Sequence, residues 1–258
     1  MKRRLDWLLR SRGIRIAHED SFLIVLDKPA PFLVIPDRYD ESIPNIYRIL
    51  KDELGEIFVV HRIDKETSGL VVFAKSAEAH TRLSEQFEGR EIGKVYEAIV
   101  RGRPERDQGM IDLPIREKIR GLMSVDRKKG KPSITRYRVL RSFRGFAHLE
   151  LRPETGRMHQ IRIHLKAIGL PILCDSAYGG GEGFHLSEIK VGYRTKVEDD
   201  GEVEEKPLLS RTALHASGLS FRHPSNGEMV AFASDLPKDM RSVVRMLSKY
   251  AGNHRREL

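Results

Sequence analysis

Short apolar runs that end at polar turns constrain the fold of this chain more than any other sequence feature. Extended patterns are predicted over residues 14–17, 22–26, 59–63, 70–74, 94–100, 134–140, 147–151, 214–221 and 230–233. Helical spacing is predicted over residues 43–54, 77–87, 157–168 and 237–250. Because strands outnumber helices and several are joined by short turns, the pattern predicts an α+β fold with a central mixed, mostly antiparallel sheet and flanking helices.

The length of 258 residues allows one large domain or two small ones, and we predict a single domain over residues 1–258. Within it, residues 1–13 are interpreted as a basic N-terminal extension. Residues 185–206 are polar and charged and include the acidic run 198–202, so we interpret them as an exposed insertion.

The chain has one cysteine, Cys174, which excludes an internal disulfide and a thiolate zinc cluster. Its apolar neighbours favour a buried structural thiol over a nucleophile. No apolar stretch approaches the length of a membrane span, and the N-terminus lacks the apolar segment of a secretory signal. A cytoplasmic location and no membrane partner are therefore expected.

The charge balance is strongly basic, with 46 Lys and Arg against 37 Asp and Glu, a formal net charge of +9. Such a balance favours a phosphate-bearing partner, although a basic surface kept for solubility is an open alternative. The basic residues gather in residues 116–144, which include Lys128, Lys129 and Lys131. This segment is the candidate binding platform.

One carboxylate, Asp64, follows an apolar run and enters a turn rich in small polar residues, in the sequence His61-Arg62-Ile63-Asp64-Lys65-Glu66-Thr67-Ser68-Gly69-Leu70. Arg62 shares a strand face with Asp64 if the extended geometry continues, because side chains repeat every two residues. Taken alone, Asp64 is a turn residue, which is a common use of Asp. Beside an arginine in a basic protein, it suggests nucleophilic chemistry on a polyanion.

The segment 157–168 is predicted as a helix with Met158, Ile161, Leu165 and Ile168 on one apolar face. Arg162 lies at the border of that face, where a charge needs a partner, and Asp64 is the proposed acid. The two histidines of this segment, His159 and His164, are five residues apart and cannot bind one metal ion together, so no metal site is expected. His164 is interpreted as a packing or hydrogen-bonding residue.

Tyr96 alternates with Ala98 and Val100 in the strand 94–100. A core tyrosine with a satisfied hydroxyl is one interpretation. The other is an aromatic plate beneath a base, with a phenol able to take part in proton transfer.

Together these blocks resemble the RluA-type family of RNA pseudouridine synthases. The resemblance rests on His61–Asp64 with Thr67–Leu70, Lys94-Val95-Tyr96, residues 155–165, Asp175, Tyr178-Gly179, residues 214–216, residues 219–221, His223-Pro224, and residues 22–29 followed by Pro36. The blocks occur in the family's order over residues 14–240. Two departures are noted: Met158 stands where threonine is usual, and residues 185–206 are longer than in compact members.

The resemblance implies a central sheet with a catalytic cleft, in which Asp64 is the nucleophile. It also implies that Tyr96 stacks on the target base and acts as the general base, that Arg162 pairs with Asp64, and that Arg62 helps to displace the nucleotide. The RNA-binding residues expected besides the catalytic ones are His61, Arg62, Arg157, His159, Lys128, Lys129 and Lys131. Isomerisation of uridine needs no redox cofactor, and the sequence carries no glycine-rich nucleotide fingerprint.

Ribosomal RNA is favoured over transfer RNA as the substrate, and the chain is expected to act as a monomer. Two other function classes stay open at this point. A non-catalytic RNA-binding protein with the same fold would bind RNA and release no product. A base-excising hydrolase would release free base and should need a second carboxylate, which the motif blocks do not offer.

Overall fold

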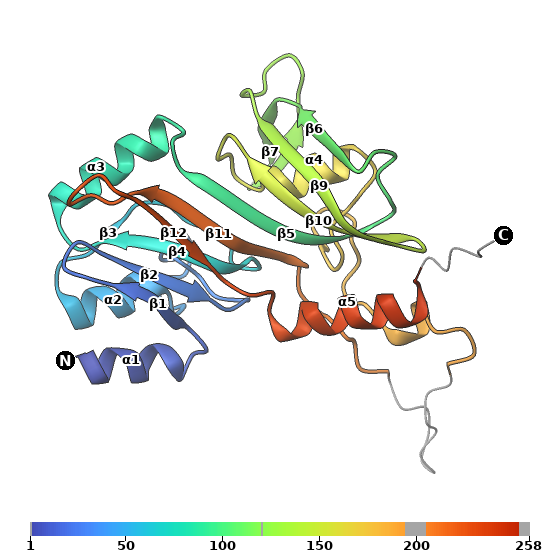
Figure 1. Ribbon diagram of the computed structural model, residues 1–258, viewed down its shortest axis with the longest axis horizontal. Helices are drawn as coiled ribbons and strands as arrows, with labels where there is room; N and C mark the ends of the chain where they lie inside the picture. The colour runs from blue at the N-terminus through green and yellow to red at the C-terminus, as the bar shows by residue number, and fades with distance from the viewer. Residues whose placement is uncertain (1, 120, 194–204, 253–258) are drawn as a thin grey trace, which may run out of the picture. The chain divides into compact units, whose positions relative to one another are not determined.

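Apolar strands gather into two units in the computed structural model, which describes residues 2–119, 121–193 and 205–252 (Figure 1). Unit 1 consists of residues 1–96 and 215–235, and unit 2 consists of residues 97–214 and 236–258. Strand β5 (Gly93–Arg101) begins in unit 1 and ends in unit 2. Strands and helices combine in an α+β fold, as the sequence predicted.

Unit 1 is built on strands that pair in the order β1-β2-β4-β11, with β3 and β12 at their sides and the first residues of β5 beside β11. The β4–β11 pair is parallel, whereas β1–β2, β2–β4, β3–β4 and β11–β12 are antiparallel. Its elements are α1 (Lys2–Arg10), β1 (Arg15–Glu19), β2 (Leu23–Lys28), α2 (Ile46–Leu54), β3 (Phe58–Val59), β4 (Ser68–Ala74), α3 (Ala77–Glu88), β11 (Leu214–Arg222) and β12 (Met229–Ala233).

Both faces of the unit 1 sheet are covered, because β2 and β4 are apolar at every second position on each side. Ile24 and Leu26 face a cluster that includes buried residues of α1 and α2. Leu23 and Val25 face a second cluster, to which α3 contributes. A sheet buried on both faces holds its connecting loops on a rigid support.

Helix α1 was not predicted, since residues 1–13 were interpreted only as a basic extension. Leu5 and Leu9 lie one turn apart in this helix and are fully buried in the unit 1 core. The exposed arginines around them hide this short apolar stripe in the sequence.

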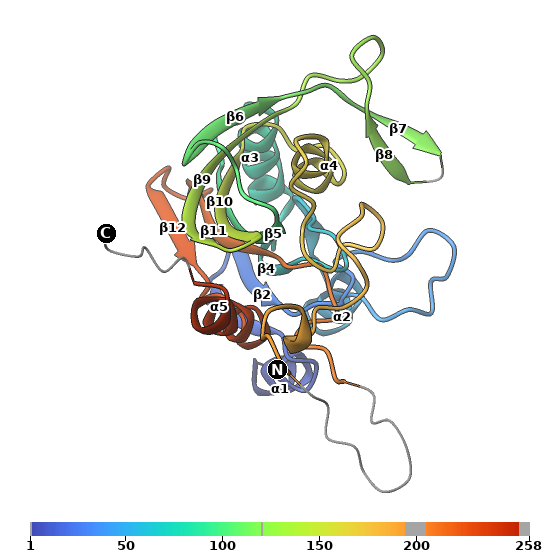
Figure 2. The same cartoon turned by 90° about the vertical axis from the view of Figure 1, so that its right-hand side faces the viewer.

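Unit 2 carries the strand order β5-β10-β9-β6, with antiparallel β9–β10 and β6–β9 pairs, and a separate β7–β8 hairpin that packs beside α4 (Figure 2). Its elements are the end of β5, β6 (Gln108–Asp112), β7 (Ile115–Ile119), β8 (Leu122–Val125), β9 (Ile134–Phe143), β10 (Phe146–Pro153), α4 (Gln160–Ala167), η1 (Leu186–Glu188) and α5 (Lys238–Tyr250).

Two predicted elements are corrected by the structure. The strand expected over residues 59–63 is limited to β3, and the chain from Val60 to Asp64 is a loop. The helix expected from Arg157 begins only at Gln160, because His159 has a left-handed backbone with φ of 53°. Met158 therefore does not belong to the apolar face of α4.

Within the predicted insertion over residues 185–206, the described part contains the single 3-10 turn η1. The acidic run 198–202 lies outside the described residues. Among the residues that the structure does describe, no helix has the length and apolar character that crossing a membrane requires.

Candidate active site

Asp64 sits in a tight turn of unit 1 immediately before β4. The backbone N–H of Thr67 donates a hydrogen bond of 3.0 Å to the carbonyl oxygen of Asp64, which closes the turn. The Asp64 side chain is partly exposed, while Thr67 and Ser68 behind it are buried. The structure thus places the predicted turn at the surface, with its carboxylate accessible and its following strand in the core.

A buried lysine fixes the backbone of this turn by hydrogen bonds. Lys28, at the end of β2, is only 1% exposed, and its Nζ donates hydrogen bonds to the carbonyl oxygens of Pro29, Phe32 and Lys65 at 3.0, 2.7 and 3.1 Å. The N–H of Phe32 donates to the same Lys65 carbonyl at 3.0 Å. Since Lys65 follows Asp64 directly, these bonds fix the backbone that carries the carboxylate.

The strand behind the turn approaches β11 so closely that only glycine fits. Gly69 has φ of 112°, and a Cβ atom there would lie 2.2 Å from the carbonyl oxygen of Ala216. Next to it, Ser68 Oγ lies 3.0 Å from Nδ1 of His215, whose Nε2 lies 3.2 Å from the carbonyl oxygen of Ser234. This contact explains the Ser68-Gly69 pair in the predicted motif.

Tyr96 lies near Asp64 within unit 1. Its ring packs against the core cluster that contains Ile63. Burial raises the pKa of the Tyr96 hydroxyl, and the negative charge of Asp64 raises it further. The phenol is therefore protonated at neutral pH, and the carboxylate is close enough for its charge to act on it.

His61 and Arg62 precede Asp64 in the same loop but have different surroundings. His61 Nε2 accepts a hydrogen bond of 3.1 Å from the N–H of Val72, and its ring stacks on Phe87 with centroids 4.7 Å apart. Burial and the nearby Lys94 charge lower the pKa of His61 to about 3, so its ring is neutral. Arg62 is exposed. His61 supports the loop, and its predicted contact with RNA stays a prediction.

Arg162 lies on α4 in unit 2 and forms a buried ion pair with Asp175. Arg162 Nε and Nη2 each donate to one oxygen of the Asp175 carboxylate at 2.8 Å, and the two residues are 7% and 0% exposed. The guanidinium also lies over the ring of Tyr178, 5.0 Å from its centroid. Arg162 thus has an acidic partner, as the sequence predicted, but Asp175 was not the predicted one. The expected pairing with Asp64 joins two units and stays a prediction.

The Tyr178 hydroxyl organises the start of α4. It accepts a hydrogen bond of 2.9 Å from the N–H of Met123 in β8 and lies 2.8 Å from Nδ1 of His159. Arg157, also predicted to bind RNA, donates its backbone N–H to Gln160 Oε1 at 3.0 Å. These bonds hold residues 157–160 as a turn at the start of α4, next to the β7–β8 hairpin.

His164 is fully buried in α4, with Nδ1 2.9 Å from Thr135 Oγ1 and Nε2 2.9 Å from the carbonyl oxygen of Leu113. It is a hydrogen-bonding residue of the unit 2 core, as the sequence predicted.

The predicted lysines lie in an exposed turn after β8. Asp126 Oδ1 accepts the backbone N–H groups of Lys128 and Lys129, each at 2.9 Å. These bonds and the nearby Arg116 lower the pKa of Asp126. Lys128, Lys129 and Lys131 are exposed, so the turn presents their charges to solvent.

The comparisons with known proteins decide the family. Residues 22–167 match the family model of RNA pseudouridylate synthases. The chain is 36% identical over 253 residues to the ribosomal large subunit pseudouridine synthase D of Pseudomonas aeruginosa, a match that covers 94% of this chain and 74% of that protein. The chain belongs to the RNA pseudouridine synthase family.

Two further matches agree with this assignment. The protein of the same name from Vibrio cholerae is 36% identical over 261 residues, which cover 97% of this chain and 76% of that protein. Among solved structures, the human protein RNA pseudouridylate synthase domain containing 4 has a TM-score of 0.68 and 25% identity, and the match covers 96% of this chain and 98% of that one. Members of this family are isomerases that convert uridine in RNA to pseudouridine, and the predicted enzyme class is confirmed.

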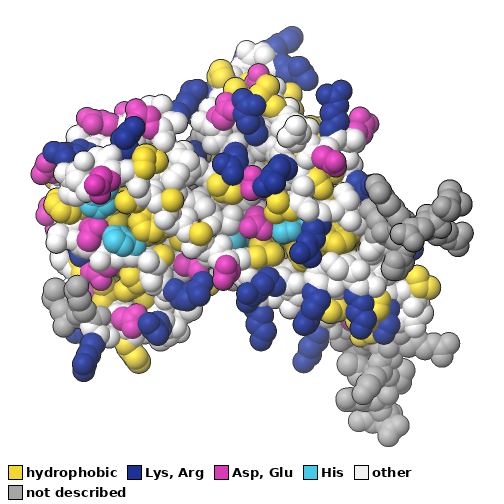
Figure 3. Space-filling model, in the orientation of Figure 1, with side chains coloured by type: hydrophobic (Ala, Val, Ile, Leu, Met, Phe, Trp, Pro, Cys, Tyr) yellow, Lys and Arg dark blue, Asp and Glu magenta, His cyan; other side chains and the backbone are white. Residues whose placement is uncertain are grey.

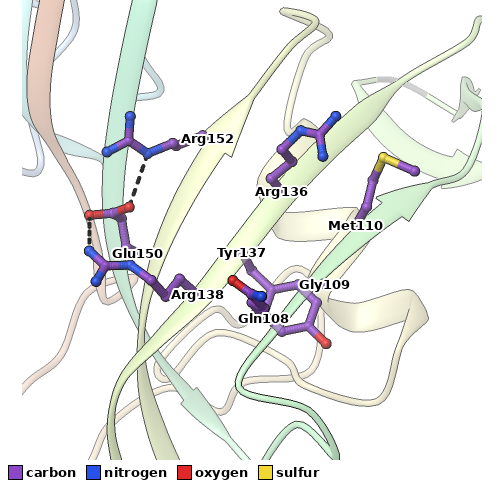
Figure 4. Close-up of a pocket in the computed structure, with 8 residues that line it drawn as sticks. All are labelled: Gln108, Gly109, Met110, Arg136, Tyr137, Arg138, Glu150 and Arg152. Carbon is purple, nitrogen blue, oxygen red and sulfur yellow. Dashed lines mark hydrogen bonds and ion pairs between the residues drawn. The ribbon is translucent and has the colours of Figure 1, made fainter.

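Residues 136–138 of the basic segment also line an open groove of about 570 Å³ on β6, β9 and β10 of this pseudouridine synthase, together with residues 108–110, Glu150 and Arg152 (Figure 4). Arg136 and Arg152 stand directly opposite each other in neighbouring strands, an arrangement of like charges that is unfavourable without an anion nearby. Glu154 pairs with Arg136, and Glu150 pairs with Arg138 and Arg152. Sequence analysis gave the charge of this segment but not the groove.

The groove arginines are well exposed: the exposed fraction of the side chain is 60% for Arg136, 59% for Arg138 and 60% for Arg152. On the side of the molecule drawn in Figure 3, Lys and Arg side chains occur among acidic ones. Exposed guanidinium groups of this kind can exchange a carboxylate for a phosphate at little cost.

Proposed function

We propose that this pseudouridine synthase modifies ribosomal RNA and that Asp64 is its nucleophile. The observation that carries the residue assignment is the placement of the Tyr96 ring against the core cluster that contains Ile63, the residue before partly exposed Asp64. The Asp64 charge raises the pKa of the Tyr96 hydroxyl, which agrees with this proximity. The names of the Pseudomonas and Vibrio relatives support ribosomal RNA as the substrate class.

The reaction requires the N1–C1′ glycosidic bond of uridine to break, the uracil to turn, and a C5–C1′ bond to form with loss of the C5 proton. The Asp64 carboxylate acts covalently. Its attack on C1′ displaces N1 of the uracil, or its attack on C6 opens the C5–C6 double bond. The bond to Asp64 breaks again as or after C5 joins C1′, which regenerates the carboxylate, and N1 takes up a proton in place of the one lost from C5. The Tyr96 ring stacks on the base and keeps it in place while the glycosidic bond is broken. A flipped-out base also needs its place in the helix filled, for which exposed Arg62 is available.

Proton removal at C5 needs an acceptor. Because Tyr96 has a raised pKa, its phenolate form is scarce, and we propose that Tyr96 relays the proton through its protonated hydroxyl and a water molecule. Arg162 is proposed to stabilise the ionised Asp64 during the reaction, since an adjacent cation favours the carboxylate form.

The location and assembly state follow as parts of the same proposal. A single buried cysteine, Cys174, and a ribosomal substrate support a cytoplasmic location. We also propose that the enzyme acts as a monomer, which light scattering of the purified protein tests directly.

The central experiment compares Asp64→Asn with Asp52→Asn, an exposed carboxylate on α2 of the same unit. Both variants are incubated with ribosomal RNA labelled with tritium at C5 of uridine, and released tritium, pseudouridine and free uracil are measured. Asp64→Asn should show no turnover above background and keep its RNA affinity, while Asp52→Asn should match the unchanged protein. Tritium release by Asp64→Asn would remove Asp64 from the chemistry.

Product analysis of the unchanged protein separates the function classes. Pseudouridine supports the isomerase, free uracil indicates a hydrolase, and binding without product indicates a non-catalytic protein. Mapping pseudouridines in total RNA from cells with and without the protein then tests the substrate: sites lost from transfer RNA alone would contradict the ribosomal assignment.

A further inference from the structure

Three potential metal ligands converge outside the candidate active site. His18 Nε2 and His223 Nε2 lie 2.8 and 2.9 Å from the same carboxylate oxygen, Oδ2 of Asp20. The three ligand atoms all lie within 4.8 Å of one another. Two imidazoles and one carboxylate form a common donor set for Zn²⁺.

The carboxylate of this cluster is fixed and ionised. Asp20 Oδ1 accepts the backbone N–H groups of Phe22 and Leu23 at 2.7 and 2.9 Å, which leaves Oδ2 toward the imidazoles. Although burial raises the pKa of Asp20, the hydrogen bonds from His18, from these two N–H groups and from His223 together lower it well below its usual range.

The two imidazoles are oriented by contacts on their other sides. Nδ1 of His223 accepts a hydrogen bond of 3.3 Å from the Ser225 N–H, and it lies 2.7 Å from Ser225 Oγ. When a metal ion takes Nε2 and the proton moves to Nδ1, the N–H bond is given up and Ser225 Oγ can accept the Nδ1 proton. The His223 ring packs edge-on against Phe22, and the His18 ring lies 5.3 Å from the Phe232 ring. A hydrogen-bond partner for the second ring nitrogen is the usual outer contact of a metal-binding histidine.

We propose that His18, Asp20 and His223 bind one Zn²⁺ ion through Nε2, Oδ2 and Nε2. Zinc bonds of about 2.0–2.1 Å in a tetrahedron separate ligand atoms by about 3.3 Å, so the two nitrogen–oxygen distances of 2.8 and 2.9 Å need to lengthen by about half an ångström. On binding, each neutral imidazole carries its proton on Nδ1, and the ion replaces the hydrogen bonds to Oδ2. The side chains are 38%, 29% and 12% exposed, which gives a water molecule access to the fourth position.

The site would act as a structural clip. Unit 1 is made of two chain segments, residues 1–96 and 215–235. His18 and Asp20 come from the end of β1 and the turn after it, whereas His223 follows β11 in the second segment. An ion shared by both segments stabilises the folded unit by mass action, because it binds the unfolded chain more weakly.

The test uses the full chain after chelator treatment and dialysis. Zn²⁺ is titrated by calorimetry, Co²⁺ is added as a spectroscopic probe, and thermal unfolding is recorded with and without Zn²⁺. We expect one ion per chain, a Co²⁺ spectrum typical of four nitrogen and oxygen ligands, and a higher Tm with zinc. No saturable binding, or a Tm unchanged by zinc, would leave the cluster as a hydrogen-bonded His–Asp–His group only.

Variants assign the binding to these residues. Asp20→Asn keeps the acceptor for the Phe22 and Leu23 N–H groups, so its fold is protected, and His18→Asn removes one imidazole. Both should abolish the one-to-one binding, and Ser225→Ala should weaken it by about 10-fold or more. The control His185→Asn removes a histidine of unit 2 and should bind zinc unchanged. Equal binding by His18→Asn and His185→Asn would overturn the proposal.

Discussion

The two units differ in the charge of the buried side chains near their candidate site residues. In unit 1, two buried titratable side chains near the Asp64 loop are neutral: burial raises the pKa of Tyr96 and lowers that of His61. In unit 2, Arg162 and Asp175 are charged and buried together, and further arginines line the exposed groove. Unit 1 is suited to hold a reacting carboxylate and a base, whereas unit 2 is suited to supply cations.

The buried and the exposed charged groups also differ in how firmly they are held. The Asp64 backbone is fixed by buried Lys28, and Arg162 is fixed by buried Asp175, so both charged groups have a set position before RNA binds. The groove arginines are exposed and pair with partly exposed carboxylates, which makes them exchangeable contacts. Substitutions in the buried and exposed sets should therefore have effects of different kinds.

The largest loss of stability is expected from Asp175→Asn, which removes the fully buried carboxylate that accepts two hydrogen bonds from the Arg162 guanidinium. Such a change should lower the free energy of unfolding by about 3–5 kcal/mol, measured by urea denaturation. Asp239→Asn is the matched control, because Asp239 makes the same two-bond contact with Arg211 but is 38% exposed. Equal losses in the two variants would mean that burial does not distinguish these pairs.

Substitutions of Tyr96 test the proposed roles of its ring and its neutral hydroxyl in unit 1. Tyr96→Leu removes the ring and should raise the activation free energy by about 1–3 kcal/mol through lost stacking alone. Tyr96→Phe keeps the ring and should lose less activity than Tyr96→Leu, with a changed pH profile of kcat because the hydroxyl relay is gone. Single-turnover rates on labelled ribosomal RNA measure both. If Tyr96→Phe is as slow as Tyr96→Leu, the hydroxyl rather than the ring carries the role.

Local patterns in the sequence predicted most of the elements that hold these residues. The alternation of 94–100 gives β5, and the helical spacing over 43–54 and 77–87 gives α2 and α3. The structure begins these helices after the capping residues Asn45 and Ser76, which were not predicted. The turn at Asp64 follows from its small polar neighbours. These features depend on contacts within a few residues, which the sequence displays directly.

Partners distant in sequence could not be predicted in this way. Asp175 pairs with Arg162 from a loop thirteen residues away, and Lys28 reaches the Lys65 carbonyl across 37 residues. Neither pairing produces a periodic signal, because each depends on the folded backbone. The start of α4 was missed for a related reason: the left-handed backbone of His159 is set by the surrounding turn rather than by its neighbours' hydropathy.

The neutral state of His61 predicts a pH dependence of stability. Because the folded pKa of about 3 lies below the unfolded value near 6.5, the unfolded chain binds a proton first as the pH falls. Stability is thus fully present above pH 6.5 and declines as the pH drops toward 3. Between pH 7 and 5.5 this residue should cost about 1 kcal/mol of unfolding free energy.

His61→Gln keeps an acceptor for the Val72 N–H and removes the titration. Urea denaturation of both proteins at several pH values should show a shallower decline for the variant. Parallel declines would mean that His61 is protonated in the folded protein as readily as in the unfolded chain.

The groove arginines should have the smallest effect, and one confined to RNA affinity. Arg136→Gln combined with Arg152→Gln removes two positive charges that lie opposite each other on neighbouring strands of unit 2. If both contact phosphates, the slope of log affinity against log salt should become shallower by about 2, with the single-turnover rate at saturating RNA unchanged. Arg10→Gln, an exposed arginine paired with Asp6 on α1, should leave the slope as it is. An unchanged slope in the double variant would place the RNA contacts elsewhere and leave the turn at Lys128 and Lys129 as the next candidate surface.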